Sequence, residues 1–158
     1  MEQTLIILKP CTVQRGLIGE IISRFEKKGL FIRGIKMMQL TDELLDEHYS
    51  HLKDKPFFGK IKEAMEICPV VVMCLEGVDA VSVVRSLVGA TNGRTAQPGT
   101  IRGDYSMSVQ ENIVHASDSN ETAAIELNRF FKKEEIFGYD HKLLLNIYAV
   151  DECSSNAK

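Results

Sequence analysis

The uninterrupted apolar run at Pro69–Leu75, P-V-V-V-M-C-L, is the strongest constraint on the fold of this chain. A run without alternating polar residues is typical of a strand that is covered on both faces. Thr4–Leu8 is a second run of this kind, and it stops at Lys9-Pro10, where proline has no backbone N–H to donate. Strands of this type need packing partners on two sides, so these runs predict a sheet with helices on its faces.

Helical patterns lie between the predicted strands. Apolar residues recur at helical spacing over Val13–Lys28, and Gly29 follows as a helix-ending residue. Thr41 and Asp118 stand where helix caps are expected, and Glu121 gives Asp118 the spacing of a capping box. The remaining predicted elements are strands at Leu30–Leu40 and Asn112–His115 and helices at Asp42–His51, Phe57–Ile67, Asp79–Val88 and Asp118–Phe131.

The order of these elements predicts an α+β fold, a ferredoxin-like split-βαβ sandwich. Four strands joined by right-handed crossovers fit most simply into one four-stranded antiparallel sheet with helices on its faces. Residues 89–110 are rich in glycine with little periodicity, which indicates a functional loop. With 158 residues the chain is expected to form one domain, 1–158, with a C-terminal extension at about 138–158 whose last residues, S-S-N-A-K, are frayed.

Composition argues against several classes of protein. The formal net charge of −3 provides no basic field for nucleic acid or an anionic membrane, so neither is expected as a required partner. The N-terminus lacks a signal-peptide pattern, and no run approaches the roughly 18 apolar residues of a membrane span. The four cysteines show neither C-x-x-C spacing nor a Cys/His ligand grouping and are expected as free thiols. Together these features predict a cytoplasmic protein.

His115 is expected at the junction between a strand and the helix that follows it. Imidazole has an unperturbed pKa of about 6.5, so much of it is neutral and nucleophilic near pH 7. The first turn of the helix offers unpaired N–H groups and a positive dipole end that can hold an anion such as phosphate. A single histidine at the end of an element is nevertheless more often a capping or core residue. The sequence around His115 alone therefore fits both a nucleophile and a structural histidine.

Polar residues at strand exits and in the long loop would complete a site for polyphosphate chemistry. They are Lys9, Arg85, Thr91, Arg102, Asn112 and His115. Three cations with a histidine suit transfer of a terminal phosphoryl group, because catalysis there is mostly positioning and charge stabilisation. Each residue alone also has an ordinary explanation as a solvated end or a loop salt bridge. RNA-binding domains share this sheet, so a non-catalytic nucleotide- or nucleic-acid-binding regulator is the alternative, although the third strand lacks stacking aromatics.

The run N-I-V-H-A-S-D-S at residues 112–119 closely resembles N-x-x-H-G-S-D-S, the active-site signature of the nucleoside diphosphate kinase family. The resemblance continues through nearly the whole chain. L-K-P-C-T-V-Q-R-G-L-I-G-E-I resembles the family's opening, H-Y-S-H-L-K-D-K-P-F-F its helical hairpin, and G-A-T-N with P-G-T-I-R-G-D-Y its long loop. The resemblance implies ping-pong transfer of the γ-phosphoryl group of a nucleoside triphosphate, mainly ATP, to a nucleoside diphosphate through a phosphohistidine at His115.

The resemblance also implies roles for individual residues. The nucleotide-binding set is Lys9, Phe57, Ile61, Arg85, Thr91, Arg102, Val109 and Asn112, in which Phe57 stacks on the base. The catalytic set is His115, Lys9, Tyr49, Ser117 and Glu126, in which Ser117 and Glu126 orient the histidine. Mg²⁺ is held mainly by the nucleotide phosphates, without protein metal ligands. Nucleoside tri- and diphosphates are the expected partners, and a homohexamer is the expected assembly, with a tetramer as the alternative.

The sequence departs from the family pattern at three places. Cys11-Thr12 replaces the usual Asp-Gly, Ala116 replaces the glycine after the histidine, and residues 90–93, A-T-N-G, replace E-T-N-P. None of these changes removes a phosphate ligand. Ala116 disfavours any backbone conformation there with positive φ, and Gly93 is expected to loosen a loop that often contributes to subunit contacts.

Overall fold

The computed structural model describes residues 1–142 and 144–153, and within them four strands form one antiparallel sheet in the order β2-β3-β1-β4. The strands are β1 (Glu2–Leu8), β2 (Phe31–Met38), β3 (Val70–Gly77) and β4 (Val114–Ala116). β1 and β3 pair along their full length, from Glu2 with Gly77 to Leu8 with Val71. This strand order confirms the predicted ferredoxin-like α+β fold.

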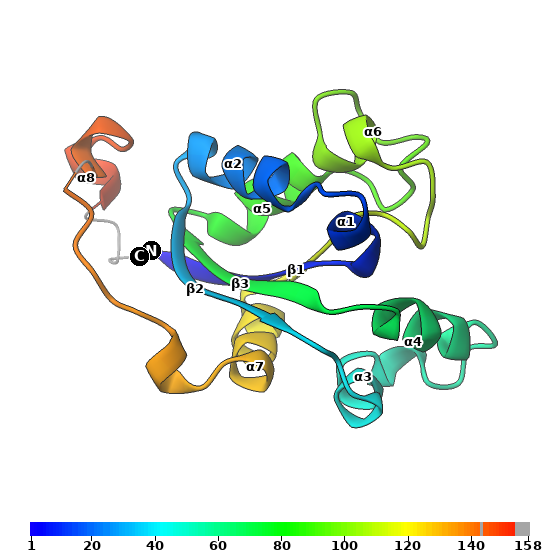
Figure 1. Cartoon of the computed structure of the whole chain (residues 1–158). Coiled ribbons are helices and arrows are strands. Elements are labelled where there is room, and N and C mark those ends of the chain that lie inside the picture. Colours follow the sequence, from blue (N-terminus) through cyan, green and yellow to red (C-terminus); the bar gives the residue numbers. More distant parts are fainter. Residues whose placement is uncertain (143, 154–158) are drawn as a thin grey trace.

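Helices cover both faces of the sheet (Figure 1). On one side lie α1 (Pro10–Gln14), α2 (Ile18–Lys28), α5 (Ala80–Val88) and α6 (Ile101–Tyr105), and on the other α3 (Asp42–His48), α4 (Phe58–Glu66) and α7 (Asn120–Phe130). Successive residues of β1 alternate between the two cores: Ile6 and Leu8 pack in one and Leu5 and Ile7 in the other, all fully buried. The uninterrupted apolar runs arise from this double coverage. In the described part of the chain the central strands β1 and β3 are covered on both faces, so they offer no open surface for the base stacking by which RNA-binding domains of this topology work.

Two helical predictions were wrong in their boundaries, and one predicted loop contains a helix. The single helix expected over Val13–Lys28 is two helices, because Gly16 adopts φ 67° between α1 and α2 and breaks the hydrogen-bonded run. The helix expected over Asp42–His51 ends at His48, and a short 3₁₀ turn at Ser50–Leu52 follows. The segment expected as a loop contains α6, whose start is capped by the Thr100 side chain accepting from the Gly103 N–H.

The junction around β4 also differs from the prediction. The strand expected at Asn112–His115 begins only at Val114 and extends to Ala116. The following helix starts at Asn120, because Ser119 is the last extended residue and its side chain accepts from the Thr122 N–H at 3.0 Å. The predicted capping box of Asp118 and Glu121 is therefore wrong, because Ser119 is the N-cap of α7.

The chain after α7 runs along the edge of the sheet at β2, at the left of Figure 1. The Phe137 N–H donates to the Arg33 carbonyl at 2.8 Å, the Tyr139 hydroxyl donates to the Ile32 carbonyl at 2.8 Å, and His141 stacks on Phe31 at 3.9 Å. Short turns at Lys133–Glu135 and Leu144–Asn146 and the helix α8 (Val150–Cys153) complete this segment. The frayed end expected at Ser154–Lys158 lies outside the described residues, as does Leu143.

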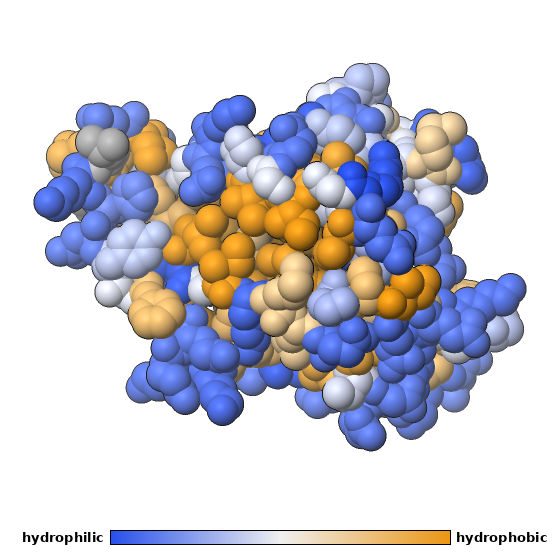
Figure 2. All heavy atoms as spheres, in the orientation of Figure 1, coloured by the Kyte–Doolittle hydropathy of each residue, from blue (hydrophilic) through white to orange (hydrophobic). Residues whose placement is uncertain are grey.

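The second half of β2, from Ile35 onward, exposes apolar side chains. Ile35 is 49% exposed and Met37 is 56% exposed. Figure 2 shows apolar side chains gathered at the centre of the molecular face that it presents, in the region of β2 and α2. An edge strand that exposes apolar side chains beside unpaired backbone groups is a surface that another chain can cover. None of the described helices is both long and apolar enough to cross a membrane.

Candidate active site

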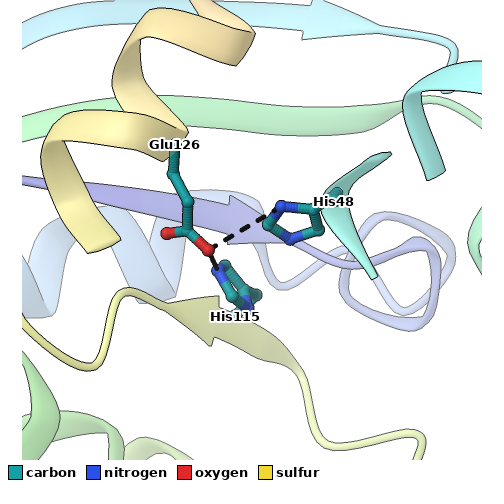
Figure 3. Close-up of side chains that lie close together, drawn as sticks. All are labelled: His48, His115 and Glu126. Atoms are coloured by element: carbon teal, nitrogen blue, oxygen red, sulfur yellow. Dashed lines mark hydrogen bonds and ion pairs between the residues drawn. The ribbon is translucent and has the colours of Figure 1, made fainter. Parts of the chain in front are cut away.

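His115, Ser117 and Glu126 form one hydrogen-bonded cluster. His115 lies on β4 opposite Ile7 of β1, and its Nε2 is 2.9 Å from Oε1 of Glu126, which projects from α7 (Figure 3). The Ser117 hydroxyl donates to the other carboxylate oxygen at 2.5 Å and accepts from the Leu5 N–H at 3.2 Å. The structure thus brings together the histidine and the two residues that were expected to orient it.

The charge state of Glu126 fixes the tautomer of His115. Burial favours the neutral acid, but the hydrogen bonds from His115 and Ser117 outweigh it and hold the pKa of Glu126 below its ordinary value. An ionised carboxylate can only accept, so the proton of a neutral His115 resides on Nε2. Nδ1 is left with a free lone pair on a side chain that is 21% exposed.

His48, at the end of α3, completes the cluster and was not among the predicted site residues. Its ring lies 4.7 Å from the ring of His115, and its Nδ1 is 3.3 Å from Nη1 of Arg129. Burial, helped by the neighbouring His115 and Arg129, lowers the pKa of His48 to about 3, so this imidazole is neutral. The ligand atoms of His48, His115 and Glu126 lie within 4.8 Å of one another. A guanidinium at this distance opposes a cation there, and Mg²⁺ prefers oxygen ligands, so the cluster does not suit Mg²⁺.

Asn112 joins the predicted cations into a second network. Its Oδ1 accepts from Nζ of Lys9 at 2.6 Å, and its Nδ2 donates to the Thr91 carbonyl at 3.0 Å. Its own carbonyl accepts from Nε of Arg102 at 3.1 Å. Asn112 is only 3% exposed, so the protein itself uses most of its hydrogen-bonding capacity. Asn112 therefore helps to position Lys9, Thr91 and Arg102.

Burial lowers the pKa of both cations in this network, Lys9 and Arg102, but both stay protonated at neutral pH. Desolvation, followed by the nearby Arg102, lowers the pKa of Lys9 to about 8. Desolvation and the charge of Arg85 lower the pKa of Arg102 to about 10. Arg102 also donates to the carbonyls of Gly89 at 3.1 Å and Val114 at 2.7 Å. Its guanidinium is therefore fixed in place, and its remaining N–H groups can face a ligand.

A strained turn places His115. Ile113 adopts φ 73° although it is β-branched and fully buried, and the Val114 N–H donates across it to the Asn112 carbonyl at 2.8 Å. This is the rare form of the γ-turn, and left-handed backbone at such a residue costs about 1–3 kcal/mol. The Ile113 carbonyl accepts from the Lys9 N–H at 2.9 Å and from the Thr12 hydroxyl. Thr12, one of the departures from the family pattern, therefore helps to hold this turn.

The other departures have local explanations. Ala116 is not among the non-glycine residues with positive φ, so alanine introduces no such strain there. Gly93 is buried, and its N–H donates to the Ser108 carbonyl at 3.1 Å. A Cβ at Gly93 would lie 2.4 Å from the Ser106 carbonyl oxygen. The expectation that Gly93 loosens the loop is corrected: the glycine allows two backbone segments to pack closely.

Two adjoining cavities meet at this site. The polar cavity, of about 530 Å³, is lined by residues that include Arg85, Arg102 and His115. The apolar cavity, of about 380 Å³, is lined by Phe57, Ile61 and Val109, together with Lys9, Asn112 and others. Tyr49 and Thr91 line both cavities. Lys9 and Asn112 thus lie on the apolar side, where they can meet the middle of a ligand that spans both cavities.

Tyr49 lies at this boundary in a buried position. Burial and the charge of Glu126 raise the pKa of its phenol to about 12. The hydroxyl therefore stays protonated near neutral pH and is available as a donor.

Comparison with known proteins gives one consistent result. The family model described as nucleoside diphosphate kinase matches residues 2–136. A protein of Parabacteroides distasonis named nucleoside diphosphate kinase is 73% identical over 152 residues, covering 96% of this chain and 99% of the relative. One of the same name from Staphylothermus marinus is 54% identical over 138 residues, covering 87% and 98%. The solved structure of a halophilic nucleoside diphosphate kinase from Halobacterium salinarum in complex with CDP matches with a TM-score of 0.91 at 42% identity, covering 93% of this chain and 98% of that chain.

The contact between Thr12 and Ile113 leads to a stability prediction. Thr12→Val keeps the shape of the side chain but removes the hydroxyl, and it should lower the free energy of unfolding by about 1 kcal/mol, the typical net value of one hydrogen bond. Urea denaturation measures the change. Thr95→Val is the control, because its hydroxyl also donates to a carbonyl, at 3.3 Å, but on an exposed side chain. Equal losses in the two variants would show that the γ-turn gains nothing from Thr12.

Proposed function

The chain belongs to the nucleoside diphosphate kinase family and shares its phosphotransferase activity, and we propose that His115 carries the phosphoryl group between two nucleotides. The single observation that carries this proposal is the bond between Nε2 of His115 and Glu126, which leaves the Nδ1 lone pair free in a cavity whose lining includes Arg85, Arg102 and Arg129. The non-catalytic alternative would not require a nucleophile prepared in this way.

The proposed reaction consists of two displacements at phosphorus. In the first, the Nδ1 lone pair of His115 attacks the γ-phosphorus of a nucleoside triphosphate, an N–P bond forms, the bridging P–O bond breaks, and the diphosphate leaves with the electron pair. In the second, the terminal oxygen of another nucleoside diphosphate attacks the same phosphorus, and the N–P bond breaks. Nε2 keeps its proton throughout, and Glu126 stabilises the positive charge that the ring gains while phosphorylated.

The cations of the polar cavity are proposed to hold the phosphates. Arg85 is exposed at the wall of this cavity, while Arg102 is fixed by its backbone contacts. A fixed guanidinium stabilises the charge that spreads over the transferring oxygens without needing to reorganise. Thr91 and Tyr49 lie between the two cavities and can contact the phosphates nearest the sugar.

The apolar cavity is proposed to receive the nucleoside. Phe57 is 44% exposed and Val109 is 50% exposed, so both present apolar surface to an incoming base, and Ile61 completes the wall. Stacking does not distinguish bases, because every base has a π-face, so this cavity favours broad base specificity. Lys9 and Asn112 at the inner end are then placed for the ribose and the first phosphate.

Phosphoryl transfer in this family uses a divalent cation, and we propose Mg²⁺ held mainly by the nucleotide phosphates. The carboxylates of the polar cavity fit this arrangement. Glu47 accepts a hydrogen bond from Arg129, and Glu126 accepts one from His115. Asp118 also lines the cavity, and its carboxylate can contact the cation or a water molecule bound to it. A cation bound in this way would neutralise phosphate charge and orient the terminal group.

We further propose a homohexamer, with a tetramer as the alternative, in which chain 1–158 acts as one unit. The exposed edge of β2, with Ile35 and Met37, supports a contact between copies, and Phe137, Tyr139 and His141 pack beside the start of that strand. The four free thiols favour a reducing compartment, which supports the expected cytoplasmic location.

The central test is formation of a phosphoenzyme. Protein incubated with γ-labelled ATP and Mg²⁺ should retain label that is labile in acid and stable in alkali, and GDP, CDP and UDP should each discharge it. His115→Ala should lose transfer by at least about 10⁴-fold, as expected on removal of a nucleophile, with a nearly unchanged melting temperature. His141→Ala, which removes a histidine stacked on Phe31 far from the cavities, is the matched control. Labelled His115→Ala protein would refute the assignment.

The pKa of Lys9 predicts how nucleotide affinity varies with pH. The group is charged below a pKa of about 8 and neutral above it, so GDP affinity should fall as pH rises from 7 to 9.5. The loss should reach about tenfold or more, the range expected for one charge-assisted contact. Isothermal titration calorimetry measures the change. Lys9→Arg stays charged over this range and should flatten the profile. An unchanged profile in Lys9→Arg would exclude Lys9 as its source.

The assembly proposal predicts a specific sedimentation result. The unaltered protein should sediment as six copies of the 17.7 kDa chain. The double variant Ile35→Lys/Met37→Lys should shift it to smaller species, because it would bury charge at the open edge of β2. Ile67→Lys is the control, since Ile67 is 61% exposed at the end of α4. A monomeric unaltered protein, or a double variant that stays assembled, would contradict the proposed contact.

A further inference from the structure

His48 is packed against the histidine nucleophile, although no step of the proposed reaction uses it. Its side chain is 1% exposed. Its ring makes edge contacts with three others: His115 at 4.7 Å, Tyr49 at 4.7 Å and Phe130 at 5.1 Å between centroids. These contacts fix the plane of the ring and set it as one wall of the space around His115.

The hydrogen bonding of His48 identifies its tautomer. A guanidinium can only donate, so the 3.3 Å contact with Nη1 of Arg129 makes Nδ1 of His48 the acceptor and leaves the proton on Nε2. Nε2 is buried and has no hydrogen-bond partner among the described residues. A buried donor without a partner destabilises the folded state, so folding stability alone does not explain a histidine at this position.

Nδ1 of His48 lies close to two groups of opposite charge. Arg129 donates through Nε to Glu47 at 2.8 Å and through Nη1 to this Nδ1 at 3.3 Å. Oε1 of Glu126 lies 3.7 Å from the same Nδ1, too far for a hydrogen bond, and 2.9 Å from Nε2 of His115 (Figure 3). Charge-assisted Arg–carboxylate pairs are among the strongest hydrogen bonds in proteins. A small side chain at position 48 would remove the acceptor of Nη1 and open space beside Oε1 of Glu126.

We propose that His48 is a positioning residue that acts as a neutral spacer, holding Arg129 away from Glu126 and so reserving Oε1 for the Nε2 proton of His115. The neutral ring offers Arg129 an acceptor and presents no competing charge to the carboxylate. If Arg129 reached Oε1, His115 would lose the acceptor that fixes its tautomer and ring orientation. Fewer molecules would then present a free Nδ1 lone pair to the γ-phosphorus. This inference rests on the proposed function, because it concerns preparation of the same nucleophile.

A double-mutant cycle tests the spacer, with the single-turnover rate of His115 phosphorylation by ATP as the readout. His48→Ala should slow this step by about tenfold or more, within the coupling range of contacting residues, while the dissociation constant of ATP changes less than about threefold. Arg129→Met sets the reference rate of the cycle, because without Arg129 the spacer has nothing to hold back. The double variant His48→Ala/Arg129→Met should react faster than His48→Ala and at close to the rate of Arg129→Met. His48→Asn, whose amide oxygen can accept from Arg129, should also retain most of it.

A second readout follows the tautomer directly. In ¹⁵N-labelled protein the His115 signals should report the Nε2–H form, a mixture in His48→Ala, and the Nε2–H form again in the double variant. His141→Ala should match the unaltered protein in both measurements, and His48→Ser replaces His48→Ala if the alanine variant does not fold.

Two failures are distinguishable. A double variant as slow as His48→Ala, or a His48→Ala protein with an unchanged rate and tautomer, overturns the spacer. An unaltered protein that takes up no label from ATP overturns the proposed function itself.

Discussion

The short ladder between β1 and β4 decides where the groups of the site lie. It consists of three residue pairs, in which Ile7 faces His115 and Leu8 faces Val114. Lys9 leaves β1 one residue beyond this ladder, and Asn112 enters from the other side, so their side chains meet. A shift of one residue would turn His115 to the opposite face of the sheet, away from Glu126 on α7. The register is secured by the buried side chains of β1, which cannot slip without exchanging the two cores.

Most of the fold and much of the site could be predicted from the sequence because local patterns carried the information. The runs at Pro69–Leu75 and Thr4–Leu8 are typical of strands covered on both faces, and the structure has them as β3 and β1. The family resemblance identified His115, Ser117 and Glu126, which the structure joins by hydrogen bonds. The family resemblance identified the site more specifically than the chemistry of single residues did, since His115 alone could equally have been a core or capping histidine.

What the sequence did not reveal depends on contacts between distant segments. His48 was missed because its partners Arg129 and Glu126 lie about 80 residues along the chain, and its place at the start of H-Y-S-H-L-K carries no chemical signal of its own. The late start of β4 was missed because isoleucine rarely adopts positive φ. The carbonyl of Ile113 is held from Lys9 and Thr12, a hundred residues away, and only the folded chain supplies those donors. The break at Gly16 was missed because the apolar spacing continues across it.

The C-terminal segment has a consequence for how chains can meet at β2. A bare edge strand can accept another strand in many alignments, and repeated addition in an open geometry gives fibres. Here the carbonyls of Ile32 and Arg33 are already occupied by Tyr139 and Phe137, so the first half of the edge is closed. An incoming strand finds only the stretch from Ile35 onward and must align with that short length. If copies pair at this edge as proposed, the segment restricts them to the registers that this short free stretch allows.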